Sequence, residues 1–486
     1  MLLAGRGRLM VLGGLVVLAA GEAALLGSGN AGSALDRLAS PAGAVAAVLG
    51  LGALAVAAFF MVSRPGWVPI VVLLAAPLRP PISFGSGGGF PISIASNGQL
   101  GRLLPLYFVL AAAALAMVWR AFDSRSAQAA VRALPRVLAL PAAAFVAVAC
   151  LSLLWAERLQ PAVELLSYFI LPFALLLGVL GRSPFPDWAP RALARAAIGL
   201  GTLFAVVGLY QAATRNLFFY APNLEVSNAN SSFFRVTSLF GDPSLYGRHL
   251  VLAMAVLLVC LALQRIEVRL GIGLLVLLWL GLFFSYSQSS MVALVGVTLA
   301  VAFATGGRSV RRMVVGGLAV VLVLSVGFLA SIEIRGQSLR RETSDRTQRI
   351  QDTTRVIKAH PVIGVGIGNQ AQASRRLSGR DRPTPNFVSH TTPLTVAAEL
   401  GVIGLALYAW LLVGGARAIL AVWRLEPGLG LALGACGLAL FAHALFYPGF
   451  LEDPLTWVVL AVAAGQLTWT RRDDGVNRRG REPAAA

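Results

Sequence analysis

Residues 246–264 read YGRHLVLAMAVLLVCLALQ, and after the first four positions every side chain except the last is apolar. A helix that crosses the hydrocarbon core of a bilayer needs roughly 20 mainly apolar residues, which this stretch supplies. Comparable runs recur along the chain, and we count 14 of them. A total of 12 or 13 spans is also possible, because the run 66–78 is short and could be tilted, re-entrant or extended by its neighbours. The predicted spans are 9–27, 42–62, 66–78, 103–120, 137–155, 162–181, 192–211, 246–264, 268–285, 289–305, 313–332, 394–415, 428–446 and 454–470.

The composition supports an all-α polytopic membrane protein. Of the 486 residues, 57% are hydrophobic and 13% are charged, whereas a soluble domain carries about a quarter charged residues. This balance excludes a soluble enzyme, a disordered chain and a disulfide-rich secreted domain. The three cysteines, Cys150, Cys260 and Cys436, lie inside apolar runs, so we interpret them as small hydrophobic residues. Histidine, cysteine and carboxylate residues are not clustered, so we predict no metal site and no cofactor.

The arginines predict an orientation. The chain has 40 basic and 21 acidic residues, and such an excess would suit nucleic acid in a soluble protein. In a membrane protein the position of basic residues in short loops matters more than their total. If the N-terminus with Arg6 and Arg8 lies inside, 22 arginines fall on that side and 7 basic residues fall outside. The long segment 333–390 is left out of this count, because the rule applies only to short loops. We therefore predict cytoplasmic termini, functional loops on the external face and no nucleic-acid partner.

Long polar segments divide the chain. We find no internal repeat, and the largest segment outside the predicted spans is basic and begins with a predicted helix, 333–360. The predicted parts are N-terminal transmembrane helices (1–211), an external loop (212–245), transmembrane helices (246–332), a large external basic loop (333–393), C-terminal transmembrane helices (394–470) and a cytoplasmic tail (471–486).

The external arginines favour a phosphate ligand. Guanidinium binds phosphate oxygens bidentately and stays charged at physiological pH. Inside a membrane the obvious phosphate carrier is a lipid, whereas a single loop arginine more often solvates the protein or contacts headgroups. The glycines of 360–369 (HPVIGVGIGN) lack the spacing and βαβ context of a dinucleotide site. We expect them to let the chain bend sharply after the basic helix.

Several motifs together resemble the O-antigen ligase and O-antigen polymerase superfamily. Arg235 followed by the stretch 241–247 (GDPSLYG) resembles the external loop of that family, and 285–290 (SYSQSS) stands where the family often has Ser-Arg-Gly. The order, spacing and external placement agree over roughly residues 200–420. The downstream part of the signature is Arg346, then His360-Pro361-x-x-Gly364-x-Gly366-x-Gly368, then His390, then Glu399-x-Gly401-x-x-Gly404.

Two positions depart from the family pattern. Gln288 replaces the arginine of the Ser-Arg-Gly turn, and Thr391 follows His390 in place of the common Asn or Ser. Either another arginine supplies the missing charge, with Arg248 the nearest candidate in the sequence, or this branch handles a different substrate.

The resemblance implies a GT-C-like bundle that transfers a glycan from an undecaprenyl-diphosphate-type lipid to an acceptor hydroxyl. The implied partners are a lipid-linked oligosaccharide donor, a glycan or glycolipid acceptor and membrane lipid. His390 would activate the acceptor, unless it only caps the following span; the other histidines, His249, His360 and His443, are interpreted as structural. Donor binding is assigned to Arg235, Arg346, Arg248 and Gln288, and structural support near the site to Glu399, Gly364, Gly366, Gly401 and Gly404.

Four alternatives remain open. A repeat-unit polymerase of the same superfamily uses another acceptor. A transporter or lipid flippase predicts charged or broken helices near the midplane and two related halves, but only Glu22 and Glu399 lie well inside predicted spans. A peptidoglycan polymerase of the shape, elongation and division type fits the His390 motif less well. A non-catalytic glycan-binding membrane protein would show no turnover.

Overall fold

The structure is a computed structural model of the chain. It describes residues 2, 10–21, 40–80, 82–84, 92–94, 103–123, 132–219, 222–320, 346–378, 388–389 and 391–479.

The described residues form a helical bundle with ten helices long and apolar enough to cross a membrane. The chain is thus an all-α polytopic membrane protein, as predicted, and the total of 14 spans stays a prediction. The ten are α2 (Pro41–Ser63), α4 (Leu104–Phe122), α6 with a 3-10 turn (Arg136–Leu154), α7–η4–α8 (Leu159–Leu180), α9 (Ala189–Thr214), α11 (Pro243–Ala262), α12 (Val268–Ser285), α13 (Gln288–Thr305), α18 (Thr392–Leu425) and α19 (Pro427–Ala444).

Shorter elements complete the described part. Two three-residue strands, β1 (Ile82–Phe84) and β2 (Ile92–Ile94), pair antiparallel. The shorter apolar helices are Met10–Gly21, η1–α3 (Pro65–Ala75) and the first part of α20 (Pro454–Arg479). The polar helices are α10 (Pro222–Ala229), α16 (Arg346–Ala359) and α17 (Gln370–Ser378).

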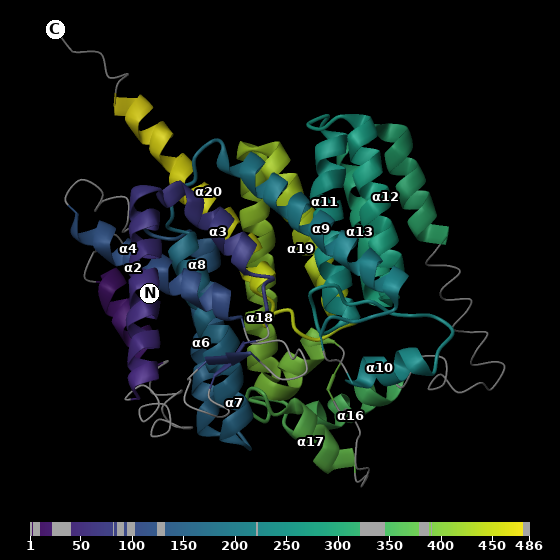
Figure 1. Cartoon of the computed structure of the whole chain (residues 1–486), viewed down its shortest axis with the longest axis horizontal. Helices are drawn as coiled ribbons and strands as arrows, with labels where there is room; N and C mark the ends of the chain where they lie inside the picture. Colours follow the sequence, from purple (N-terminus) through teal and green to yellow (C-terminus); the bar gives the residue numbers. More distant parts are fainter. Residues whose placement is uncertain are drawn as a thin grey trace.

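The connecting segments collect at the two ends of the bundle (Figure 1). α10, α16 and α17 gather at the lower end of the view, and the C-terminus leaves from the upper end. At the end opposite α16 and α17, Trp67 packs on Trp188 with ring centroids 5.3 Å apart. There, too, the guanidinium of Arg265 lies against Gly428. The loops predicted to be cytoplasmic and those predicted to be external therefore separate in space.

Helix α3 is shorter than a full span. It ends at Ala75 while packed against α4, α9 and α20. Ala76 and Pro77 are buried, and Arg79 is half-buried against the bundle. The run 66–78 thus contains a short helix, and the loop after it brings a basic residue to the bundle.

Local capping fixes where α11 and α13 begin. The Asp242 carboxylate accepts hydrogen bonds from the backbone N–H of Ser244 and Leu245, and Pro243 occupies the first helical turn. The Ser287 hydroxyl accepts the N–H of Ser290 at the start of α13. Such side-chain caps satisfy amides that have no partner within the helix. Both starts lie at the end of the bundle where α10 packs.

Candidate functional site

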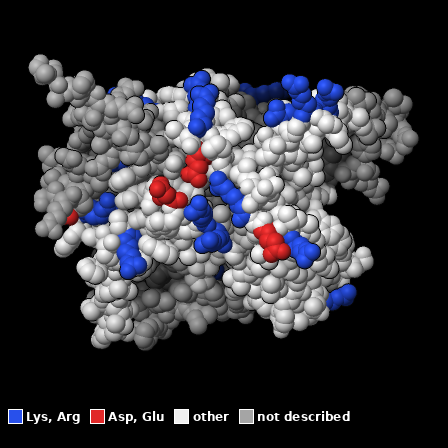
Figure 2. Space-filling view, turned by 90° about the horizontal axis from the view of Figure 1, so that it is seen from above, with Lys and Arg blue, Asp and Glu red and all other residues white. Residues whose placement is uncertain are grey.

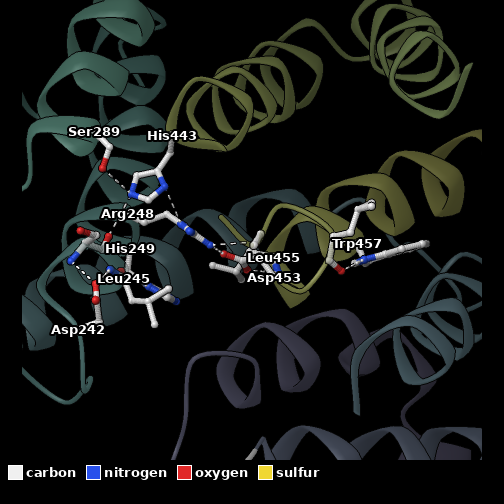
Figure 3. Close-up of polar contacts among 12 residues, drawn as sticks. Asp242, Leu245, Arg248, His249, Ser289, His443, Asp453, Leu455 and Trp457 are labelled. Atoms are coloured by element: carbon white, nitrogen blue, oxygen red, sulfur yellow. Dashed lines mark hydrogen bonds and ion pairs between the residues drawn. The ribbon is translucent and has the colours of Figure 1, made fainter. Parts of the chain in front are cut away.

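A buried polar cluster lies where α11, α13, α19 and the loop before α20 meet (Figure 3). Arg248 and Asp453 form an ion pair, and both side chains are almost completely buried. Asp453 Oδ1 also accepts the backbone N–H of Leu455 at 2.8 Å. Burial raises the pKa of Asp453, but the nearby guanidinium of Arg248 and the imidazole of His249 outweigh it, so the net pKa is lowered. Asp453 is therefore a carboxylate at neutral pH.

His443 connects this ion pair to the α12–α13 turn. Arg248 Nε lies 3.3 Å from His443 Nδ1. Because Nε–H can only donate, Nδ1 accepts and the ring proton sits on Nε2. His443 Nε2 lies 3.2 Å from the Ser244 carbonyl oxygen and 3.1 Å from Ser289 Oγ. The hydroxyl of Ser289 in turn lies 3.2 Å from Ser287 Oγ, so the polar chain reaches the helix cap.

Arg79 adds a second guanidinium to the cluster. Burial lowers the pKa of Arg79, the Asp453 carboxylate raises it, and Arg248 lowers it further, so Arg79 lies within electrostatic range of the ion pair. Burial also raises the pKa of Glu452, and its buried Oε2 has no hydrogen-bond partner in the described structure. Two arginines, Arg79 and Arg248, thus lie near the ion-paired carboxylate of Asp453 and the carboxyl group of Glu452.

Arg235 lies beside the turn that separates α12 from α13. Its backbone is clamped by the Asn228 side chain, which accepts the N–H and donates to the carbonyl, both at 3.0 Å. The Arg235 Nε–H donates to the Ser285 carbonyl at 3.3 Å. Burial lowers the pKa of Arg235, and nearby Asp242 offsets part of that effect. Gln288 is exposed at the same turn.

The glycine-rich segment after α16 docks on a break in α18. Gly364 and Gly366 have positive φ, as does Gly401, where α18 leaves helical geometry. Gly366 N–H donates to the Glu399 carbonyl at 2.9 Å, and Val402 N–H donates to the Pro361 carbonyl at 2.9 Å. A Cβ on Gly364 would overlap the Glu399 carbonyl group. Only glycine permits this backbone conformation at such close approach.

A sequence model of the O-antigen ligase family matches residues 273–409, just under a third of the chain. The matched segment includes most of α12, the α12–α13 turn, α16, α17 and the broken start of α18. These residues are therefore similar to the O-antigen ligase family, and the apolar helices make the chain an integral membrane protein. No curated protein matches the chain. Arg79, Arg235, Arg248 and Asp453 all lie outside the residues that match the O-antigen ligase family.

Glu399 supports the ligase segment from inside the bundle. Its Oε1 accepts the backbone N–H of Gln370 at 3.3 Å, at the start of α17. Gln370 also donates to Thr353 of α16 at 3.1 Å, and its side-chain carbonyl accepts the N–H of Ser389 at 3.0 Å. Glu399 therefore holds α17 against α18. Gly404, one turn after the break, is buried against Leu400.

The structure brings three of the predicted binding residues to one end of the bundle. Arg235 and Gln288 lie at the α12–α13 turn, and Arg248 lies one layer deeper. Arg248 is already paired with Asp453, so it is not a free replacement for the family arginine. Arg346 begins α16, and its side chain lies outside the described residues.

His390 also lies outside the described residues, whereas both of its neighbours in the sequence are described. Ser389 is bound to Gln370. The Thr391 hydroxyl donates to the Leu445 carbonyl at 3.2 Å, which ties this segment to the loop that carries Asp453.

The sequence analysis missed Arg79 and Asp453 and interpreted His443 as structural. One signal was available, because Asp453-Pro454 precedes a predicted span in the same way as Asp242-Pro243 does. For Arg79 there was no comparable signal, since an isolated loop arginine is usually solvated. His443 makes contacts with charged and hydroxyl groups that its surrounding apolar run does not suggest.

Proposed function

We propose that this protein transfers a glycan from an undecaprenyl-diphosphate-type lipid to an acceptor hydroxyl on the external face of the cytoplasmic membrane. The observation that carries the proposal is the placement of two arginines, Arg79 and Arg248, near the buried carboxylate of Asp453. This cluster adjoins the turn built by the segment that matches the O-antigen ligase family. Buried guanidinium groups suit a diphosphate that gains charge as it leaves.

In the proposed reaction the acceptor hydroxyl oxygen attacks the anomeric carbon of the donor sugar. The bond from that carbon to the diphosphate oxygen breaks, and the lipid diphosphate departs with its electron pair. Arg235 and Arg346 bind the diphosphate, and Arg79 adds charge from the bundle side. His390 accepts the hydroxyl proton, because an unperturbed imidazole is mostly neutral at pH 7. Thr391, the next residue, is bound to the loop that carries Asp453, which supports this placement.

We place the isoprenoid tail of the donor in an apolar groove that opens between the helix Met10–Gly21, α2, α4 and α8. The groove has a volume of about 710 Å³. Tyr107 lines it and lies within electrostatic range of Arg79. A tail in this groove would therefore reach the cluster with its headgroup.

The external side follows from the arginine distribution, because the end that bears α10, α16 and α17 carries the loops predicted to be outside. We also propose that the chain is divided into three groups of transmembrane helices, separated by two long external segments. A polymerase would use the same donor chemistry with a second lipid-linked glycan as acceptor. We favour the ligase reaction because the matching family model is that of O-antigen ligase.

The test is transfer by the purified full-length protein in liposomes that contain a lipid-linked oligosaccharide donor and a glycolipid acceptor. We expect His390→Ala to abolish transfer while donor binding and thermal stability stay near those of the wild type. Added imidazole should restore part of the activity. The matched control is His360→Ala, whose side chain is exposed. Full specific activity in His390→Ala would refute the role of His390, and absence of turnover in the wild type would refute the enzyme.

A further inference from the structure

A second polar cavity lies at the opposite end of the bundle from the Arg248–Asp453 pair. It has a volume of about 490 Å³ and lies between the first turns of α9, the turn after α11 and the turn before α19. Arg191 and Arg195, one turn apart on α9, and Arg265 line it. Figure 2 views this end and shows basic side chains gathered there with fewer acidic ones.

The three arginines of this cavity are available to a ligand. All three are exposed, and none takes part in the ion pairs found among the described residues. Asp187 and Glu426 also line the cavity, which leaves an excess of positive charge. The Arg265 guanidinium lies against Gly428, the second residue of α19, where a side chain would displace it.

An apolar slot continues from this cavity into the bundle. The two cavities share Pro190 and Ala194, and the slot passes between α3, α9, α11, α19 and α20 with a volume of about 120 Å³. Its lining includes Phe204, and since a helix rises about 1.5 Å per residue, the slot extends roughly 21 Å along α9 from Pro190. Apart from His249 and Cys436, aliphatic, proline, glycine and phenylalanine side chains line it.

A charged mouth that opens on a narrow apolar slot matches the two parts of an amphiphile. We propose that this cavity binds an anionic phospholipid, with its phosphate on the three arginines and the first methylene groups of one acyl chain in the slot. Arginines bind phosphate oxygens bidentately, and basic pockets between transmembrane helices on the cytoplasmic side receive anionic headgroups. A free phosphate ion would use the arginines and leave the slot unused. The arginine distribution assigns this end to the cytoplasmic leaflet, where such lipids are available. The arginine mouth lies away from the proposed transferase site, whereas the far end of the slot reaches His249, the neighbour of Arg248 in the sequence.

The test compares three additives in thermal unfolding of the purified full-length protein in a mild detergent. These are phosphatidylglycerol, phosphatidylcholine and inorganic phosphate. We expect a saturable rise in melting temperature with phosphatidylglycerol and little change with the other two. Arg191→Gln combined with Arg195→Gln should weaken the apparent affinity at least about tenfold, the effect of losing one charge-assisted contact.

The matched control replaces Arg308 and Arg312 by glutamine, because both are exposed and do not line the cavity. It should respond to phosphatidylglycerol as the wild type does. Ala194→Phe narrows the junction of the cavity and the slot, so it should weaken the response to lipid with the arginines intact. Equal responses to both lipids, or an unchanged response in the variant at Arg191 and Arg195, would overturn the proposal. A full response to phosphate alone would show a site for a free anion instead.

Discussion

Replacing Asp453 by asparagine removes the carboxylate that Arg248 binds inside the bundle. Arg248 is only 4% exposed and Asp453 is also 4% exposed, so water cannot replace the lost partner. Removing one member of a buried ion pair costs about 3–5 kcal/mol, because the other charge stays buried without compensation. We expect Asp453→Asn to destabilise the protein by an amount in that range. The hydrogen bond from Arg248 Nε to His443 Nδ1, 3.3 Å long, cannot balance the charge, since it is the contact of a neutral ring.

Glu157→Gln is the matched control for this prediction. Glu157 also pairs with an arginine, Arg376, at 2.6 Å, but the side chain of Arg376 is 57% exposed. Exposed pairs contribute about 0–1 kcal/mol. The assay is thermal unfolding in a mild detergent, read out by intrinsic fluorescence, with the melting temperatures of both variants compared with that of the wild type. A drop for Asp453→Asn no larger than for Glu157→Gln would refute the reasoning.

The pH dependence supplies an independent check on the Asp453 pair. The net pKa of Asp453 is lowered because Arg248 and His249 outweigh the effect of burial. A carboxylate with a lowered pKa stabilises the fold above its unfolded pKa of about 3.9, and this contribution is lost as the pH falls through the folded value. The stability difference between wild type and Asp453→Asn should therefore stay constant from neutral pH to about pH 5 and shrink only in stronger acid. A difference that already disappears at pH 6 would contradict the assignment.

Three further outcomes are expected. Arg235→Lys keeps the charge but loses the planar fork, so it should reduce transfer about tenfold to a hundredfold in the liposome assay with unchanged expression; near-normal rates would move the donor site elsewhere. Gly364→Ala should destabilise the protein by about 1–3 kcal/mol through strain at positive φ, measured by thermal unfolding. The control Gly296→Ala, in open space on α13, should not destabilise it. Equal effects would show that the docking of 361–366 on α18 contributes little to stability. In a variant without native cysteines, Ser378→Cys should react with an impermeant thiol reagent from outside and Ser309→Cys should not; labelling of both from one side would refute the orientation.

The sequence by itself determined the class of the fold and most of its membrane helices. The predicted runs 268–285 and 289–305 coincide within a residue with α12 (Val268–Ser285) and α13 (Gln288–Thr305). This agreement has a direct cause, since a span must be long, apolar and internally hydrogen-bonded wherever it packs. The ligase motifs in 346–404 were also readable, because they lie close together in the chain. Their glycines are also recognisable, because a sharp turn with positive φ favours glycine at a fixed position.

Only the tertiary structure decided which polar residues meet. Arg79, Arg248, His443 and Asp453 come from four segments separated by long apolar stretches, and only the Asp453-Pro454 pair gave a local signal. Their contacts arise because α3 stops short and the loop before α20 folds inward, which depends on how the helices pack. How helices pack depends on the fit of many side chains from different helices, so a single sequence does not show which helices meet. For the same reason the sequence offered Arg248 as a free phosphate ligand, whereas in the structure it is bound to Asp453.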